Sequence, residues 1–419
     1  MLTVPRLLAL AALTAALLER WRIVALPLWF LAVALIPSLW LAGRRLGTVR
    51  LSLPMALFCV FVPLSLAWNE DPGYSYRGVL TFCAFVLIAL WLVVSETPSS
   101  ALGLLAAAAA VTLVASVVVV LLMPDLFPPE VDNPDAFRGI FTHKNWLGLA
   151  VGYLILAVIH LKPRHRALRW LPIGAGVPLL IAAKSVGAGI ALVITLVAVG
   201  GLAWLRRWLS PNMQRAAQVA AIGGGVVLLF TGFQWVYGLA VDLGKGRSID
   251  RRFELWTVAF QHALERPLFG WGWRGSLSES RGVGAAITRD MGGFQTTSTH
   301  NGYVDIFLQA GIVGSVLLAI LVVRSIWPPR RDPSLRGWSA LVLFSALVTV
   351  TDSFLAGHVP ILIVLTAYLF AHNPHLWQES AESPDEPTGH ADQVHAVTAD
   401  RRRHSGRDEP PRGDPGDGD

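Results

Sequence analysis

The chain has 419 residues, of which 54% are hydrophobic and only 15% charged. The core of a soluble domain cannot bury that much apolar side chain, so the composition excludes an ordinary soluble protein and predicts an integral membrane protein. The net charge of +6 requires no nucleic-acid partner, because the basic residues gather in short connections and in the C-terminal tail. Cys59 and Cys83 both fall inside apolar runs, which excludes a disulfide framework.

Apolar runs follow one another along the chain, and most are long enough to cross about 30 Å of hydrocarbon as helices. They lie near residues 4–18, 23–41, 51–67, 78–94, 101–123, 146–161, 170–183, 186–205, 216–237, 304–325, 337–355 and 359–372. The prediction is an all-α, polytopic membrane domain over residues 1–372 with about 12 transmembrane helices. From residue 373 the composition turns polar without apolar periodicity, so we expect a disordered tail over 373–419.

The basic residues predict the orientation. With the N-terminus in the cytoplasm, the inside connections contain Arg44, Arg45, Arg50, Lys162, Arg164, Arg166, Arg169, Arg206, Arg207, Arg215, Arg324, Arg330, Arg331 and Arg336. The outside connections 68–77 and 351–358 contain only Arg77, as the positive-inside rule requires, although Arg20 and Arg22 break the pattern. Both termini are then cytoplasmic, and a medium loop (123–145) and a large loop (about 238–302) lie outside.

The medium loop and the following short turn contain polar candidates at the membrane edge. Before the run at 146–161 stand Arg138, His143, Lys144 and Asn145, which suit an anionic headgroup or simple anchoring at the interface. Lys184 and Ser185 occupy the turn between two runs, where a lysine without a partner is costly.

The large loop is expected to contain an amphipathic helix that lies on the bilayer or on the outer ends of the spans. Asp250 is its predicted N-cap and Pro267 its end, and its apolar stripe consists of Phe253, Trp256, Phe260 and Leu264.

Three arginines mark the start of that helix. Arg251 and Arg252 fall in its first turn and Arg247 just before it, where amides and guanidinium groups form a site for phosphate-like anions. The alternative is that these arginines are solvated or meet lipid headgroups. Trp271 and Trp273, which follow, are expected to anchor the loop at the interface.

His300-Asn301 ends the large loop directly before an apolar run. The dipeptide alone is uninformative, since His372-Asn373 repeats it at the start of the tail. Position distinguishes His300: a titratable imidazole stands where a polar loop returns to the membrane.

In this order the motifs resemble the signature of the O-antigen ligase and polymerase superfamily over roughly residues 138–315. The resemblance rests on Arg138-Gly-Ile-Phe-Thr-His-Lys-Asn145, Ser185, Arg252-Phe-Glu-Leu-Trp256, Phe269-Gly-Trp-Gly-Trp-Arg274 and His300-Asn-Gly-Tyr-Val-Asp-Ile-Phe-Leu-Gln-Ala-Gly311-Ile-Val-Gly314. It implies a glycosyltransferase of the bacterial inner or plasma membrane. Such an enzyme moves a glycan from polyprenyl (undecaprenyl) pyrophosphate to an acceptor hydroxyl in cell-surface polysaccharide biosynthesis, as ligase or polymerase.

Matching positions imply the roles of single residues. His300 is the general base, Asn301 orients it or the acceptor, and Arg138 and Arg252 bind pyrophosphate, with Arg247 as a helper. A neutral imidazole suits proton removal near pH 7, and cationic donors stabilise the charge of the leaving pyrophosphate. We place His143, Lys144, Asn145 and Lys184 in the substrate-binding set. The family's basic residue normally follows the turn serine, whereas here Val186 follows it and Lys184 precedes it.

No cofactor is expected, since the only Asp-x-Asp pair, Asp417-Gly-Asp419, lies at the chain end. Arginines would replace a divalent cation, and direct displacement would invert the anomeric centre. The expected partners are the lipid-linked glycan, a glycan or lipid acceptor, membrane lipids and other components of a polysaccharide assembly complex. Glu254, Glu265 or Asp305 is an alternative base. A flippase or exporter of lipid-linked glycans and a non-enzymatic membrane component of such a complex remain alternative functions.

Overall fold

The computed structural model describes residues 3–18, 22–128, 130, 133–205, 208, 210, 213, 246–274, 281–294, 298–327, 335–354 and 358–382. Within these residues the secondary structure is helical, without a strand, which confirms the all-α class. The helices are α1 (Val4–Leu17), α2 (Arg22–Ala34), α3 (Ile36–Leu41), α4 (Gly43–Gly47), α5 (Leu53–Leu64), α6 (Pro72–Ser95), α7 (Pro98–Leu122), α8 (Lys144–Leu161), α9 (Arg166–Ala182), α10 (Val186–Leu205), α12 (Gly246–Glu265), α13 (Gly282–Asp290), α14 (Gly302–Ile326), α15 (Arg336–Val348), α16 (Val359–His372) and α17 (His375–Glu382), with short 3-10 turns at Ser65–Trp68 and Pro124–Leu126.

Five helical segments are long and apolar enough to cross a membrane: Val24–Leu41, Ser75–Ser95, Pro98–Leu122, Lys144–Leu161 and Gly302–Ile326. Shorter apolar helices cover Val4–Leu17, Leu53–Trp68, Val186–Gly201, Arg336–Val348 and Val359–His372. These segments coincide with predicted runs, whereas the run at 216–237 lies outside the described residues. The total of about 12 spans therefore stays a prediction.

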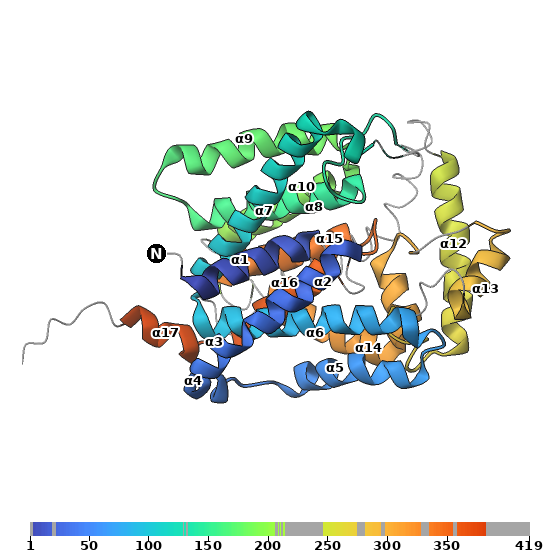
Figure 1. The fold of residues 1–419 in the computed structure, drawn as a ribbon, viewed down its shortest axis with the longest axis horizontal. Helices are drawn as coiled ribbons and strands as arrows, with labels where there is room; N and C mark the ends of the chain where they lie inside the picture. The colour runs from blue at the N-terminus through green and yellow to red at the C-terminus, as the bar shows by residue number, and fades with distance from the viewer. Residues whose placement is uncertain are drawn as a thin grey trace, which may run out of the picture. The chain divides into compact units, whose positions relative to one another are not determined.

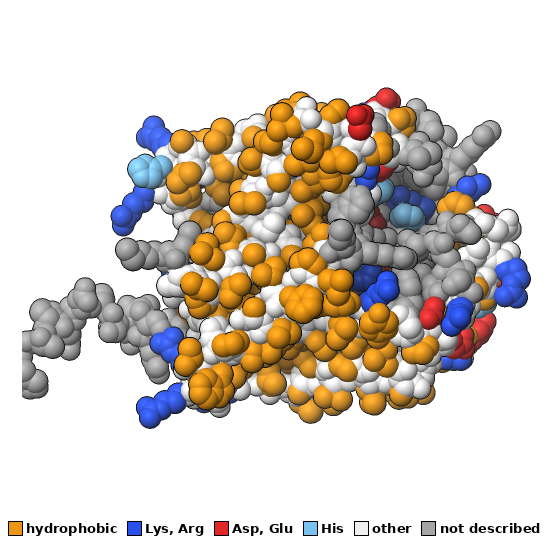
Figure 2. Space-filling view, in the orientation of Figure 1, with side chains coloured by type: hydrophobic (Ala, Val, Ile, Leu, Met, Phe, Trp, Pro, Cys, Tyr) orange, Lys and Arg blue, Asp and Glu red, His pale blue; other side chains and the backbone are white. Residues whose placement is uncertain are grey.

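Helices α8 and α16 form the centre of the bundle. Every residue of α16 from Val359 to Ala371 is buried, and α8 is buried from Trp146 to Val158. Helices α7, α9, α10 and α15 pack on α8, and α6, α14 and α15 pack on α16 (Figure 1). Hydrophobic side chains cover the lateral surface in Figure 2, while charged ones gather towards its two ends. This distribution matches a bundle whose sides face hydrocarbon.

Helix α14 is broken at Gly311, and the stretch of the large loop just after α12 fills the break. Gly311 has φ +58°, and a Cβ there would meet the backbone of Leu268. Trp271 N donates to Leu308 O at 2.9 Å, and Ile312 N donates to Pro267 O at 2.8 Å. The backbone groups freed by the break are thus satisfied by the loop, as a buried irregular segment requires.

This contact corrects the expectation for Trp273, which we predicted to anchor the loop at the membrane interface. Its side chain is fully buried and makes edge contacts with Phe58 and Phe82. The physical reason is the close approach of the loop to α14, which draws the tryptophan into the bundle. Its neighbour Trp271 is partly buried and donates from Nε1 to His262 O at 2.8 Å.

The segment expected to be disordered from residue 373 instead starts with structure. Asn373 is fully buried and its Oδ1 accepts a hydrogen bond from Arg50 N at 2.6 Å. Helix α17 follows, with Leu376 and Trp377 each 6% exposed. Two apolar side chains and one amide are enough to hold this short stretch, so the expected boundary at 372 moves to at least Trp377. Residues 383–419 lie outside the described part.

Candidate active site

A buried carboxylate, Asp352, is the centre of a polar network at one end of the bundle. It lies between α15 and α16, and its side chain is 13% exposed. Asn145 Nδ2, at the start of α8, donates to Asp352 Oδ2 at 2.8 Å. His300 Nδ1, at the start of α14, lies 3.9 Å from Asp352 Oδ1, a charge contact rather than a hydrogen bond. Three segments far apart in the sequence therefore meet at one carboxylate.

The surroundings of Asp352 keep it ionised. Burial by itself raises the pKa of this carboxyl, but the charges of His300 and His143 and the hydrogen bonds from Asn145 and the Ser353 amide outweigh it. The pKa of Asp352 therefore lies below its ordinary value. At neutral pH the network therefore contains a negative charge.

The network extends from Asp352 to the turn between α9 and α10. Ser185 is 3% exposed, and its Oγ donates to Asn145 Oδ1 at 3.0 Å. A Cβ at Gly148 would lie 2.5 Å from Ser185 Oγ, so only glycine lets the turn approach α8 this closely. Ser185, Asn145 and Asp352 thus form a continuous chain of hydrogen bonds that ends beside His300.

His300 stands in a strained turn fixed to the same connection as Asp352. Its φ is +54°, and its side chain is 33% exposed. Gly302 N donates to Thr349 O at 2.9 Å and to Asp352 O at 3.2 Å, which holds the turn against the α15–α16 connection. Asn301 accepts from Tyr303 N and Val304 N with Oδ1 and caps α14. Its expected role in orienting His300 or the acceptor stays a prediction.

Helix α12 runs across the bundle direction in Figure 1 and contacts the site with two side chains. Arg252 Nη1 donates to Thr351 O at 3.2 Å, next to Asp352. Trp256 Nε1 donates to Thr299 O at 2.7 Å, next to His300. Arg252 is partly exposed, and the hydrogen bond to Thr351 O uses one of the five N–H donors of its guanidinium.

The expected start of α12 is wrong, because the helix already includes Gly246–Glu265. Asp250 therefore lies within it and is not the N-cap, and Arg251 and Arg252 lie beyond the first turn. Their side chains rather than the helix N-terminus would meet an anion. Arg247 is in the first turn, but its side chain lies outside the described part. The buried face consists of Leu255, Ala259 and Ala263, whereas Phe260 and Leu264 of the predicted stripe are 49% and 54% exposed.

The medium loop uses its own polar residues to stay folded. Arg138 donates from Nε and Nη2 to Pro128 O, at 3.0 and 2.7 Å, and from Nη1 to Phe141 O at 3.2 Å. Lys144 is 9% exposed and its Nζ donates to Asn133 Oδ1 at 2.7 Å. Both cationic side chains therefore help to stabilise the folded loop.

His143 links this loop to the network. Its Nδ1 accepts from Asn145 N at 3.2 Å and caps α8, which leaves the ring proton on Nε2, 3.5 Å from Glu130 Oε2. Lys184 lies further out, with its Nζ 3.6 Å from Asp135 Oδ2 and its side chain 54% exposed.

Comparison with known proteins finds one family. Residues 140–319 match the family model described as O-antigen ligase. The match covers less than half of the chain and shows what this segment is similar to. The similarity points to glycan ligation or polymerisation in polysaccharide biosynthesis, and the long apolar helices are those of an integral membrane protein. No curated protein matches the chain.

Of the predicted residues, four lie around Asp352 or next to it: His143, Asn145, Arg252 and His300. The O-antigen ligase segment contains all four, whereas Asp352 follows it in the chain. Asp352 was not among the predicted site residues, because it stands alone in the short connection 351–358 and belongs to none of the motifs. A signal was present, since Asp352 is the one carboxylate in the chain between Asp332 and Glu379.

The structure gives two of the alternative bases other roles. Asp305 is fully buried in α14, and its Oδ1 accepts from Thr299 N at 3.1 Å. Glu265 pairs with His262 Nδ1 at 2.8 Å, on the side of α12 that meets α13. Glu254 is exposed. Among the residues that the structure describes, no group of three His, Cys, Asp or Glu side chains could hold a metal ion.

Proposed function

We propose that this protein transfers a glycan from a polyprenyl pyrophosphate, such as undecaprenyl pyrophosphate, to an acceptor hydroxyl on the outer face of a bacterial cell membrane. The product is a cell-surface polysaccharide, made as a ligase or as a polymerase. The observation that carries the proposal is the contact between His300 and the buried Asp352, beside Arg252, at the end of an O-antigen ligase segment.

In the proposed step, the acceptor oxygen attacks the anomeric carbon of the donor and loses its proton to His300 Nε2. Asp352 faces the other ring nitrogen, Nδ1, and stabilises the imidazolium that forms. The bond between the anomeric carbon and the pyrophosphate oxygen breaks, and its electron pair leaves with the polyprenyl pyrophosphate. A single displacement of this kind inverts the anomeric centre.

The leaving pyrophosphate gains negative charge as the bond breaks, so a nearby guanidinium lowers the barrier. Arg252 is the proposed donor, because it lies next to Asp352 while part of its side chain is exposed. Arg247 is its proposed helper. Arg138, Lys144 and Lys184 act at the rim, where their present partners are backbone oxygens and the side chains of Asn133 and Asp135.

Reconstitution tests the proposed function. Purified full-length protein in proteoliposomes, supplied with a polyprenyl-pyrophosphate glycan and an acceptor glycan, is expected to form a glycoside and release polyprenyl pyrophosphate. EDTA should leave the rate unchanged, because arginines take the role of a divalent cation. Movement of the intact donor across the bilayer without product would indicate a flippase and contradict the proposal. Loss of transfer in EDTA, with recovery on adding a divalent ion, would contradict the metal-free step.

Arg252→Ala is expected to weaken transfer by about 10²-fold in kcat/KM, the loss typical for one donor to a developing anion. Arg251→Ala is the matched control: it is exposed on the same helix, and its guanidinium lies 4.8 Å from the ring centroid of Phe294. Steady-state rates at varied donor concentration measure both variants. An equal loss of kcat/KM in the two variants would mean that Arg252 contributes only to the general surface charge.

A further inference from the structure

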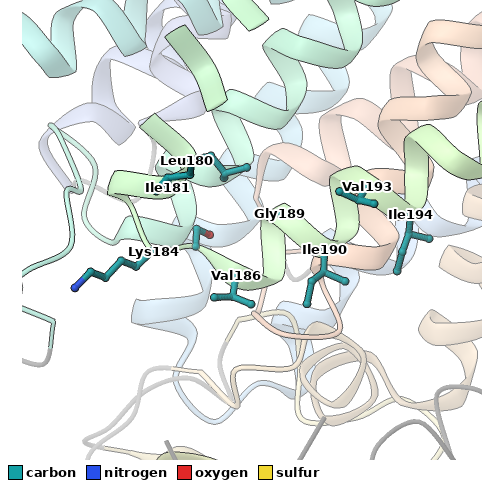
Figure 3. Close-up of a pocket in the computed structure, with 9 residues that line it drawn as sticks. Leu180, Ile181, Lys184, Val186, Gly189, Ile190, Val193 and Ile194 are labelled. Atoms are coloured by element: carbon teal, nitrogen blue, oxygen red, sulfur yellow. The ribbon is translucent and has the colours of Figure 1, made fainter. Parts of the chain in front are cut away.

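A shallow groove of about 490 Å³ runs along one side of α10 and onto the C-terminal end of α9. Figure 3 shows its apolar side chains in a row, with Lys184 at one end. The apolar lining consists of Leu180, Ile181, Val186, Ile190, Val193 and Ile194. Four of these side chains are more than half exposed, although they are aliphatic: Ile181 71%, Val186 56%, Ile190 52% and Val193 60%. Such a surface is suited to hydrocarbon and not to water.

The polar end of the groove lies at the candidate active site. Its two polar lining residues are Lys184 and Ser185. Ser185 belongs to the hydrogen-bond chain through Asn145 to Asp352. The Lys184 side chain extends beyond the apolar row, so its ammonium lies past the end of the hydrocarbon surface (Figure 3). One end of the apolar track therefore has both a cation, Lys184, and a residue of the site's hydrogen-bond chain, Ser185.

We propose that this groove binds the polyprenyl chain of the donor next to its pyrophosphate, with Lys184 beside the pyrophosphate. The inference rests on the proposed function and adds the place where the carrier lipid is recognised. Charge complementarity supports it, because a single-chain lipid with a doubly anionic head matches a single track that ends at a cation. The present partner of that cation, Asp135 at 3.6 Å, is 84% exposed, so the pyrophosphate would replace an exposed carboxylate. From Val186 to Ile194 the helix rises by about 12 Å, well under the roughly 30 Å of a hydrocarbon core. The groove thus binds only the part of the polyprenyl chain nearest the pyrophosphate.

Lipid tails and protein aliphatic groups are equally apolar, so the polyprenyl chain would be bound through shape and packing contacts rather than through the hydrophobic effect. A larger side chain that fills the groove should therefore prevent the polyprenyl chain from binding. Gly189 lies in the groove, and a Cβ there would meet only Leu180 at 3.8 Å, an ordinary contact. Gly189→Leu can thus project into the groove without forcing the backbone apart. Gly200→Leu is the matched control, because a Cβ at Gly200, on the same helix, meets nothing within 4 Å.

The test measures equilibrium binding of radiolabelled undecaprenyl pyrophosphate to the full-length protein in detergent, with phosphatidylglycerol as competitor. Gly189→Leu is expected to bind it about tenfold more weakly, through lost packing contacts. Gly200→Leu and His300→Asn should bind as the wild type does. Val193→Trp fills the groove from a second position and should reproduce the loss if Gly189→Leu fails to fold.

Three results would overturn the inference. If Gly189→Leu and Val193→Trp bind undecaprenyl pyrophosphate as the wild type does, and the wild type transfers glycan, the groove is not the binding site and the proposed function stands. Displacement by equimolar phosphatidylglycerol would make the groove a site for ordinary membrane lipid. A wild type that neither binds undecaprenyl pyrophosphate nor transfers glycan would refute the groove together with the proposed function.

Discussion

His300→Asn is expected to lower kcat for glycan transfer by about 10²–10⁴-fold, the usual contribution of a positioned general base. Asparagine is the informative replacement, because the φ of +54° at this position strains most residues and asparagine tolerates it. Loss of the imidazole then removes the proton acceptor without reshaping the turn. The measurement is single-turnover transfer by purified variant and wild type at saturating donor.

The matched control is His372→Asn, in the second His-Asn dipeptide of the chain. His372 follows the buried length of α16, and its Nδ1 contacts Tyr368 O at 2.9 Å. It stands at the C-terminal end of α16, about 20 Å along the helix from the end that follows Asp352. Its replacement should therefore leave kcat within about twofold. Undiminished transfer by His300→Asn would remove the assignment of the base.

Asp352→Asn should also lower kcat, by about 10²–10⁴-fold, with little change in the KM for the donor. The replacement keeps the size of the side chain and an oxygen for Asn145, but removes the charge that faces the His300 ring. Asp135→Asn is the control, because this carboxylate is 84% exposed and pairs with the rim residue Lys184 at 3.6 Å. The measurement is the transfer rate of both variants at saturating donor, which should fall in Asp352→Asn and not in Asp135→Asn.

The pH profile distinguishes a charge effect from a merely structural one. The pKa of Asp352 lies below its ordinary value, so its charge is present at neutral pH and is lost only as the pH falls through that depressed pKa. An acid limb near neutrality therefore belongs to imidazole. Without the carboxylate the protonated ring is less favoured, and the limb of Asp352→Asn should move to lower pH. A lower plateau with an unmoved limb would show that Asp352 only supports the fold.

The alternation of apolar runs and short basic connections determined the class of this protein, because hydrocarbon leaves a spanning segment no partner for its backbone except its own helix. The ordered motifs pointed to the family whose model matches residues 140–319, and the polar loop before His300 made that residue the candidate base. These features are local in sequence. They can be read without knowing which helices touch.

Only the tertiary structure decided which polar residues share a site. Asp352 contacts Asn145 and His300, which lie 207 and 52 positions away in the sequence. The apolar residues around Asp352 in the sequence give no sign of either contact. Trp273 left its expected place at the interface for the same reason, because folding brings it against the aromatic rings of Phe58 and Phe82. Folding also gives Arg138 a backbone partner, Pro128 O, while its role towards pyrophosphate stays a prediction. Local patterns determine helices, but long-range packing determines which charge each imidazole or guanidinium meets.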